Sequence, residues 1–261
     1  MDLGLIGKNA LVLGASQGIG AAIAEVLAQE GCNLYLGARR SEHIKALARD
    51  LNKKYEIQTE PYQIDLMEAT SVEELCLTIK KDWEIDILLN NTGGPPPSPS
   101  TGVSDKVWND SLQSLLMSTI RVTEAATEGM KKRKWGRILT IASSSVIQPI
   151  PNLGVSNTVR SALVGFSKTL SNEVAKDGVT VNMILPGRID TERLAAIDKT
   201  SANIQGITYE EARDRSRASI PAGRYGTVNE FADVAVFLMS SCASYVTGSL
   251  IRVDGGIIRS V

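Results

Sequence analysis

The stretch from Ala10 to Gly20, with the sequence ALVLGASQGIG, most constrains how this chain can fold. Its apolar start is typical of a short buried strand, and the apolar residues 21–28 that follow predict a helix. Three glycines, Gly14, Gly18 and Gly20, lie in the turn between them. Glycine lets the backbone approach a ligand closely, and the N–H groups of a helix N-terminus attract an anion. The turn therefore predicts a site for the pyrophosphate of a dinucleotide; the alternative is an ordinary strand–helix turn.

The same alternation of strand and helix continues along the chain. We expect helices at 41–54, 71–81, 105–132 and 157–175, the second of them capped by Thr70 or Ser71. We expect strands at 32–38, 85–91, 137–142, 179–185 and 250–253, and one further strand that ends at residue 65. Parallel strands need crossover connections, which place helices on both faces of the sheet. Because no repeat or linker interrupts residues 1–261, we predict a single domain with a doubly wound α/β fold.

Composition limits the classes of partner and the compartment. Lys and Arg number 28 against 29 Asp and Glu, so net charge gives no reason to expect nucleic acid or an anionic membrane as a partner. Cys32, Cys76 and Cys242 are too far apart for a disulfide framework or a zinc spacing, which favours a reducing compartment and no metal site. The start MDLG lacks the features of a signal peptide, and no run reaches membrane-spanning length. We therefore expect a soluble, cytoplasmic protein.

Three features have less specific interpretations. The prolines from Pro95 to Pro99 follow an expected strand end, which favours a stiff loop beside a ligand site over a polyproline motif for a partner. The basic run 131–134 lies at an expected helix C-terminus, where cations complement the helix dipole, so we interpret it as a solvated helix end. The single histidine, His43, lies in a polar helix, and no nucleophile elbow accompanies it, which disfavours a Ser–His–Asp hydrolase.

Several motifs occur in a fixed order along the chain: LGASQGIG at 13–20, Asp65, NNTG at 90–93, Pro186-Gly187 followed by Thr191, YVTG at 245–248 and VDGG at 253–256. Taken together, they resemble the motifs of the short-chain dehydrogenase/reductase family over nearly the whole chain. The resemblance implies a Rossmann-type sheet of about seven parallel strands, NAD or NADP as cofactor, and a homo-oligomer, usually a tetramer. It also implies that the cofactor contacts a set of residues spread along the chain: Gly14, Ser16, Gln17, Gly18, Ile19, Gly20, Arg39, Arg40, Asp65, Leu66, Asn91, Gly93, Arg160, Pro186, Gly187, Ile189 and Thr191.

The choice between the two cofactors follows from the end of the second strand. An acidic side chain there would accept hydrogen bonds from the adenosine ribose and favour NAD. This chain has Ala38 followed by Arg39 and Arg40, so no carboxylate repels a 2′-phosphate and a guanidinium is available to bind one. We therefore predict NADP(H) over NAD(H); the alternative is that the two arginines only begin a solvated helix.

The catalytic positions depart from the family pattern. The family uses a serine after the fifth strand, a tyrosine as general acid/base, a lysine four residues later and a helix asparagine. Aligning residues 137–143 with that strand matches the serine to Ser143, and the tyrosine and lysine positions then hold Ser156 and Arg160. The asparagine position holds Leu115, so only the serine is kept.

Two hypotheses follow from these substitutions. A serine is too weak an acid to replace a tuned tyrosine, and an arginine stays charged, although it can bond the ribose and stabilise a developing alkoxide. In the first hypothesis the protein is an oxidoreductase in which Ser143 and Ser156 contact a carbonyl, Arg160 supplies charge, and water or another side chain supplies the proton. In the second it is a non-catalytic NADP(H)-binding sensor or partner subunit. We favour the enzyme, by analogy with the family.

The resemblance also bears on the substrate. Residues from about 190 to 220 are similar to the family's substrate-covering helices, and the nearest pattern is that of 3-oxoacyl-carrier-protein reductases, with sugar dehydrogenases next. The expected substrate is therefore a small molecule or an acyl chain on a carrier protein, for which Arg121, Lys131, Lys132 and Arg133 offer a basic docking surface. Nothing in the sequence brings Tyr209, Tyr225 or Tyr245 beside the nicotinamide.

Overall fold

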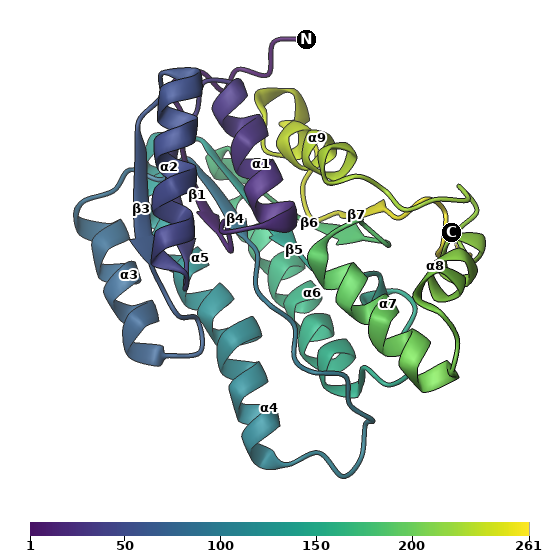
Figure 1. The fold of residues 1–261 in the computed structure, drawn as a ribbon. Coiled ribbons are helices and arrows are strands. Elements are labelled where there is room, and N and C mark those ends of the chain that lie inside the picture. Colours follow the sequence, from purple (N-terminus) through teal and green to yellow (C-terminus); the bar gives the residue numbers. More distant parts are fainter. Residues whose placement is uncertain (261) are drawn as a thin grey trace.

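The computed structural model describes residues 1–260 and is built on one seven-stranded parallel sheet (Figure 1). The strand order is β3-β2-β1-β4-β5-β6-β7, so the direction of winding reverses between β1 and β4. This confirms the expected doubly wound α/β fold. The strands are β1 (Asn9–Leu13), β2 (Asn33–Ala38), β3 (Thr59–Gln63), β4 (Ile87–Asn90), β5 (Gly136–Ile141), β6 (Val179–Pro186) and β7 (Leu250–Val253).

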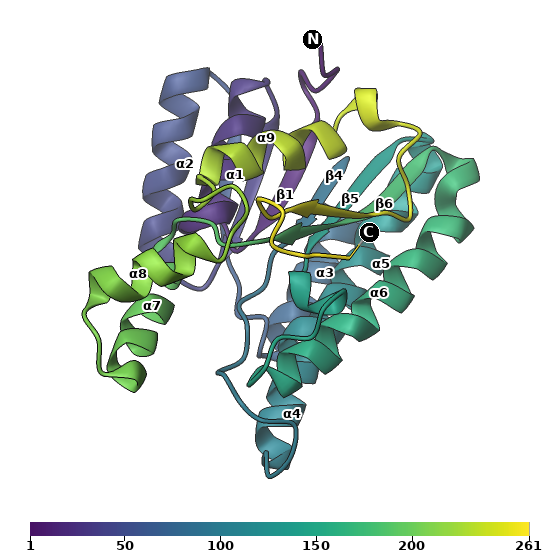
Figure 2. The ribbon, with the colours of Figure 1, turned by 90° about the vertical axis from the view of Figure 1, so that its right-hand side faces the viewer.

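Helices cover both faces of the sheet. Figure 2 shows α1, α2 and α9 on one side and α3, α5 and α6 on the other. The α-helices are α1 (Gly18–Gln29), α2 (Ser41–Tyr55), α3 (Ala69–Lys81), α4 (Asp105–Ser111), α5 (Ser118–Arg133), α6 (Gly154–Val174), α7 (Glu192–Gln205), α8 (Tyr209–Ala218) and α9 (Val228–Leu238). Of the helices in the described residues, none is long and apolar enough to cross a membrane.

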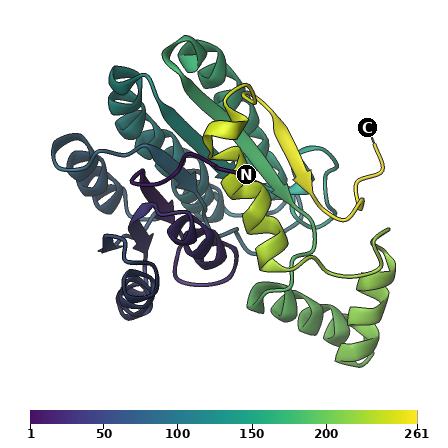
Figure 3. The ribbon, with the colours of Figure 1, turned by 90° about the horizontal axis from the view of Figure 1, so that it is seen from above.

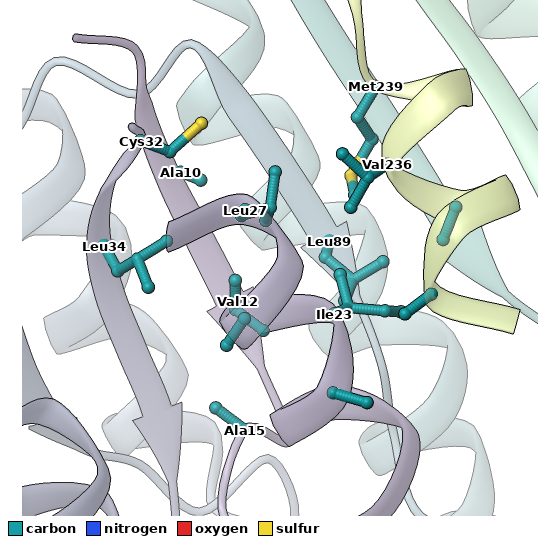
Figure 4. Packing of buried hydrophobic residues seen from close by; sticks show 14 of the residues in the cluster. Ala10, Val12, Ala15, Ile23, Leu27, Cys32, Leu34, Leu89, Val236 and Met239 are labelled. Atoms are coloured by element: carbon teal, nitrogen blue, oxygen red, sulfur yellow. The ribbon is translucent and has the colours of Figure 1, made fainter. Parts of the chain in front are cut away.

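The two faces of the sheet bury separate apolar clusters. On the first face, Ile23 of α1 packs with Val12 and Leu89 of the sheet and with Val236 of α9 (Figure 4). The central strands β1, β4, β5 and β6 are buried almost throughout, which explains their continuous apolar sequences. Pro61 lies in β3 at the sheet edge, where a missing backbone donor is tolerated.

The expected cap of α3 is wrong. The helix begins at Ala69 with Glu68 at the N-cap, so Thr70 and Ser71 both lie inside its first turn. The Ser71 hydroxyl instead accepts a hydrogen bond from the Asp65 backbone N–H at 3.2 Å. This contact ties the end of the β3 segment to α3.

The long helix expected at 105–132 is interrupted in its middle. A π-helix, η1 (Leu112–Met117), separates α4 from α5. Hydroxyl groups around it bond to the carbonyl four residues earlier, and such contacts commonly bend helices; they belong to Ser111, Ser114, Ser118 and Thr119. The interruption changes which side chains face the neighbouring helix α6.

Helices α7 and α8 stand apart from the two covering layers. They occupy one corner of the molecule, where they are the green pair in Figure 3. Buried Asp198 of α7 accepts a hydrogen bond from the Tyr225 hydroxyl at 2.8 Å. Tyr225 packs with Leu194 and Ile220, so this cluster joins the pair to the rest of the fold.

Candidate active site

Two positions of the glycine-rich turn between β1 and α1 leave no room for a side chain. Gly14 has φ +65°, and a Cβ there would lie 2.6 Å from the Asn91 carbonyl oxygen. A Cβ at Gly20 would overlap the Gly14 carbonyl oxygen. The Asn91 side chain donates a hydrogen bond to that same oxygen at 3.2 Å, which ties the turn to the end of β4. The backbone can therefore approach a bound pyrophosphate closely at the N-terminus of α1.

A cavity of about 950 Å³ opens at the carboxyl ends of β1, β2 and β4. This is the point where the winding of the sheet reverses, which is where doubly wound folds bind ligands. Nine of the residues expected to bind the cofactor line it: Gly14, Ser16, Gln17, Arg39, Arg40, Asp65, Leu66, Asn91 and Gly93. Pro95 and Pro96 also line it, so the proline stretch forms part of this cavity's wall. The individual contacts with the cofactor remain predictions.

The other residues expected to bind the cofactor lie outside this lining. Thr191 is the N-cap of α7, where its hydroxyl accepts from the Leu194 N–H at 3.3 Å, and its side chain lies beside Gly18. Ile189 is buried and forms an isolated bridge with Gly226. These contacts hold the loop after β6 close to the glycine-rich turn. The remaining members of the set are Gly18, Ile19, Gly20, Arg160, Pro186 and Gly187.

Two exposed arginines follow β2 at the rim of the cavity. Arg40 donates hydrogen bonds to the side chains of Gln17 and Ser16 in the glycine-rich turn. Among residues 1–260, neither Arg39 nor Arg40 forms an ion pair with a carboxylate of this chain. No carboxylate therefore neutralises either guanidinium group, and both cations can bind a phosphate, as the 2′-phosphate of NADP(H) requires.

Two of the three candidate catalytic residues, Ser143 and Arg160, meet at the end of β5. Ser143 follows this strand, and its hydroxyl accepts a hydrogen bond from the Ser145 N–H at 3.1 Å. Ser156 and Arg160 lie one turn apart on α6 and are both buried. Arg160 Nη1 donates to the carbonyls of Ile141 at 3.2 Å and of residue 142 at 3.3 Å, directly before Ser143.

The environment of Arg160 is unusual for a charged side chain. Burial and, to a smaller extent, the nearby charge of Arg193 together lower the pKa of its guanidinium to about 10. Arg160 nevertheless stays protonated near pH 7. It can therefore stabilise a negative charge at this site, but it does not readily give up a proton.

The helix position at which the family has an asparagine holds an apolar residue here, and the side chains around it are apolar as well. Leu115 lies in the π-helix and packs against Val155 and Val159 of α6. An asparagine relay has no counterpart at this position, because the space is filled by packed aliphatic side chains.

No tyrosine of the described chain hydrogen-bonds to Ser143, Ser156 or Arg160. Tyr225 donates to Asp198, and burial raises the pKa of its hydroxyl, which makes it a poorer proton donor. Tyr245 is fully exposed, at 102%. A replacement for the missing acid is therefore not found among these side chains.

The sequence interpretation missed residues that packing brings to the site. Asp110, Ser111 and Ser114, from α4 and the π-helix, line the cavity together with Glu192. Arg193 reaches across from α7, so that a Cβ at Gly94 would lie 2.5 Å from its Nη2 atom. Only a weak indication of Glu192 and Arg193 was present in the sequence, where they directly follow the expected loop residue Thr191.

Comparison with known proteins gives consistent matches over the whole chain. A family model described as enoyl-(acyl carrier protein) reductase matches residues 14–258. The 3-oxoacyl-[acyl-carrier-protein] reductase FabG of Aquifex aeolicus is 35% identical over 260 residues, which cover 98% of this chain and 100% of that protein. L-sorbose reductase from Gluconobacter frateurii, solved with NADPH and L-sorbose, has a TM-score of 0.94 at 32% identity, with both chains covered completely. YwfH, an NADPH-dependent reductase involved in bacilysin biosynthesis, has a TM-score of 0.93 at 28% identity, covering 98% of this chain and 100% of that one.

Proposed function

The chain belongs to the short-chain dehydrogenase/reductase family and is an NADP(H)-dependent oxidoreductase, and we propose that it interconverts a carbonyl and an alcohol through an atypical catalytic site. The observation that carries this proposal is that Ser143 and Arg160 meet at the end of β5, with Ser156 one turn before Arg160 on α6. The relatives act on 3-oxoacyl chains and on a sugar ketone, as their names state, so both substrate classes are candidates.

The residues present fit NADP(H). The glycine-rich turn packs against Asn91 so closely that Gly14 has no room for a Cβ, and Arg39 and Arg40 offer cations without a carboxylate partner for the 2′-phosphate. Asp65 and Leu66 would hold the adenine side, and the loop after β6 with Thr191 would hold the nicotinamide side. When bound, the cofactor supplies or accepts the hydride at the carbonyl carbon, while the oxygen gains or loses a proton.

In this proposal the protein polarises the substrate rather than donating the proton itself. The hydroxyls of Ser143 and Ser156 donate hydrogen bonds to the carbonyl oxygen, and the buried charge of Arg160 stabilises the negative charge that develops there. Water supplies the proton. Because general acid–base catalysis contributes about 10²–10⁴-fold, turnover should be slow but measurable.

The test is NADPH oxidation by the purified protein with a panel of 3-oxoacyl and sugar-like carbonyl compounds. We expect Ser143→Ala to lower kcat about 10²–10³-fold, because a donor to the developing oxyanion is lost. Ser145→Ala is the matched control, since this neighbouring hydroxyl has no hydrogen-bond partner among the described residues and its backbone N–H is kept. Tight NADPH binding without turnover, unchanged in Ser143→Ala, would support a non-catalytic sensor instead.

Docking of a carrier protein on the basic end of α5 has weaker support. Lys132 pairs with Glu128 at 2.8 Å and Arg133 with Asp86 at 3.2 Å, and Lys131 lies 3.9 Å from Asp177. These pairs reduce the positive charge that the sequence implies at this surface. Alanine at Lys131 and Lys132 should lower turnover of a carrier-bound substrate only if docking occurs there. That the protein forms a homo-oligomer stays a prediction, which size-exclusion chromatography would test by measuring the mass of the particle in solution.

A further inference from the structure

Arg160 is a buried cation that no acidic side chain of the described chain neutralises. It is 6% exposed, and within residues 1–260 no carboxylate oxygen lies within 4.0 Å of its guanidinium. Only Nη1 donates hydrogen bonds to described residues, so Nε and Nη2 remain available. A buried charge without a partner costs free energy that a bound anion would recover.

Arg193 brings a second cation to the same place. It extends from the first turn of α7 to the Gly94 backbone after β4, and Gly94 lines the cofactor cavity. Its charge acts on Arg160, and this Coulombic effect is the second cause that lowers the pKa of Arg160. Like Arg160, it forms no ion pair within the described residues. Arg160 bonds to carbonyls at the end of β5 and Arg193 lies against Gly94 after β4, so the two guanidinium groups lie at the C-terminal ends of neighbouring strands.

Three acids line the cavity, Asp65, Asp110 and Glu192, and within the described residues none of them forms an ion pair with Arg160 or Arg193. Asp110 pairs with Lys106 at 2.6 Å. Glu192 lines the cavity, but among the described residues it pairs with neither arginine. The anionic groups of NADP(H) already have other sites, since the glycine-rich turn accepts the pyrophosphate and the arginines after β2 accept the 2′-phosphate. An anion at Arg160 and Arg193 must therefore come from the substrate.

We propose that Arg160 and Arg193 bind a carboxylate of the substrate, so that the enzyme acts on an oxo acid or the corresponding hydroxy acid rather than on a neutral ketone or ester. The inference rests on the proposed carbonyl–alcohol chemistry and narrows its substrate. A guanidinium binds a carboxylate through paired hydrogen bonds, and Ser143 next to this site would then face the neighbouring carbonyl. Binding the carboxylate fixes the position of the reacting carbon relative to the serine hydroxyls.

The test compares 2-oxo and 3-oxo acids with their methyl esters at saturating NADPH. We expect the wild-type protein to prefer the acids by at least about 10²-fold in kcat/KM, because an ester leaves the two cations unpaired. Arg193→Met should remove about tenfold or more of this preference, mainly by raising KM for the acids, and Arg193→Lys should restore part of it. Arg215→Met is the matched control, since Arg215 lies on α8 and bonds only to Gln205 among the described residues.

Other outcomes overturn the inference in distinguishable ways. Equal turnover of acids and esters, unchanged in Arg193→Met, would refute it and leave the proposed function standing. A weaker NADPH affinity in Arg193→Met with an unchanged acid preference would assign the two cations to a cofactor phosphate. If no carbonyl compound is reduced, the proposed function fails, and calorimetric titration of the NADP⁺ complex decides the inference: binding of 2-oxo acids but not of esters supports it, and binding of neither refutes it.

Discussion

At the scale of single residues, Arg160 shows a conflict between stability and function. Burial penalises its charged form, which is why its pKa falls to about 10, below the usual value of a guanidinium. The unfolded chain holds this proton more tightly, so stability rises as the pH increases above about 10, and the full cost is present at lower pH. Such a cost is tolerated where a buried charge serves binding or catalysis.

Arg160→Met should therefore stabilise the protein while removing its activity. We expect the free energy of unfolding in urea at pH 7 to rise by about 1–3 kcal/mol, because an apolar side chain replaces an unpaired buried charge. Arg137→Met is the matched control: Arg137 is also buried, but it donates to three carbonyls and lies over Trp135. This control should lose about 2–4 kcal/mol. A loss of stability in Arg160→Met as large as in the control would contradict the argument.

Ala38→Asp tests the residue that decides cofactor preference. Ala38 ends β2 and lines the cavity, so a carboxylate there would repel the 2′-phosphate and accept hydrogen bonds from the ribose. We expect the Kd for NADPH, measured by fluorescence titration, to rise about 10–100-fold while that for NADH falls. Gln58→Glu is the control: it makes the same change in charge directly before the N-terminal end of β3, at the edge of the sheet away from the cavity. It should alter neither the Kd for NADPH nor the Kd for NADH. Tighter NADPH binding by the Ala38→Asp variant would show that the 2′-phosphate binds elsewhere.

At the scale of elements, regular alternation was predictable and local interruption was not. The strands that contain Ala10, Ile138 and Val181 were predicted correctly from the sequence. Both of their faces are buried, so their sequences are continuously apolar. The π-helix between α4 and α5 has an ordinary helical composition, and its hydroxyl contacts to the preceding turn appear only in three dimensions. Helix α3 shows the same limit, because Ser71 bonds to the end of the β3 segment instead of capping its own helix.

The helix pair α7–α8 should depend on one buried hydrogen bond. Tyr225→Phe removes the donor to Asp198, whose carboxylate is 2% exposed and keeps only Arg188, 3.8 Å away, as a cation partner in the described chain. We expect a loss of about 1–3 kcal/mol in the free energy of unfolding and faster hydrogen exchange across residues 192–218. Tyr209→Phe is the control, because the Tyr209 hydroxyl accepts only from Arg213 at the partly exposed surface. Equal exchange in the two variants would show that the buried bond does not hold the pair.

At the scale of the whole molecule, the cofactor half of the site was easier to predict than the substrate half. The roles of the glycine-rich turn and of Arg39 could be predicted from the sequence, because each directly follows the end of the strand that positions it. The contact of Arg193 with Gly94 joins segments about a hundred residues apart and depends on how α7 packs, which no local pattern records. Helix α6 begins at Gly154, before the expected start at residue 157, so Ser156 and Arg160 lie four residues apart on one helix face.

Cofactor binding should therefore stabilise the fold as a unit, because the cavity is formed by turns from four neighbouring strands. NADPH at a hundred times its Kd should add about 2.7 kcal/mol to the free energy of unfolding, or raise Tm by roughly 5–10 °C. Gly14→Ala should abolish this shift relative to its own baseline, since the new Cβ would lie 2.6 Å from the Asn91 carbonyl oxygen. Gly165→Ala should keep it, because a Cβ at this position of α6 meets nothing within 4 Å. A full shift in Gly14→Ala would mean that the phosphates bind without close approach to the turn.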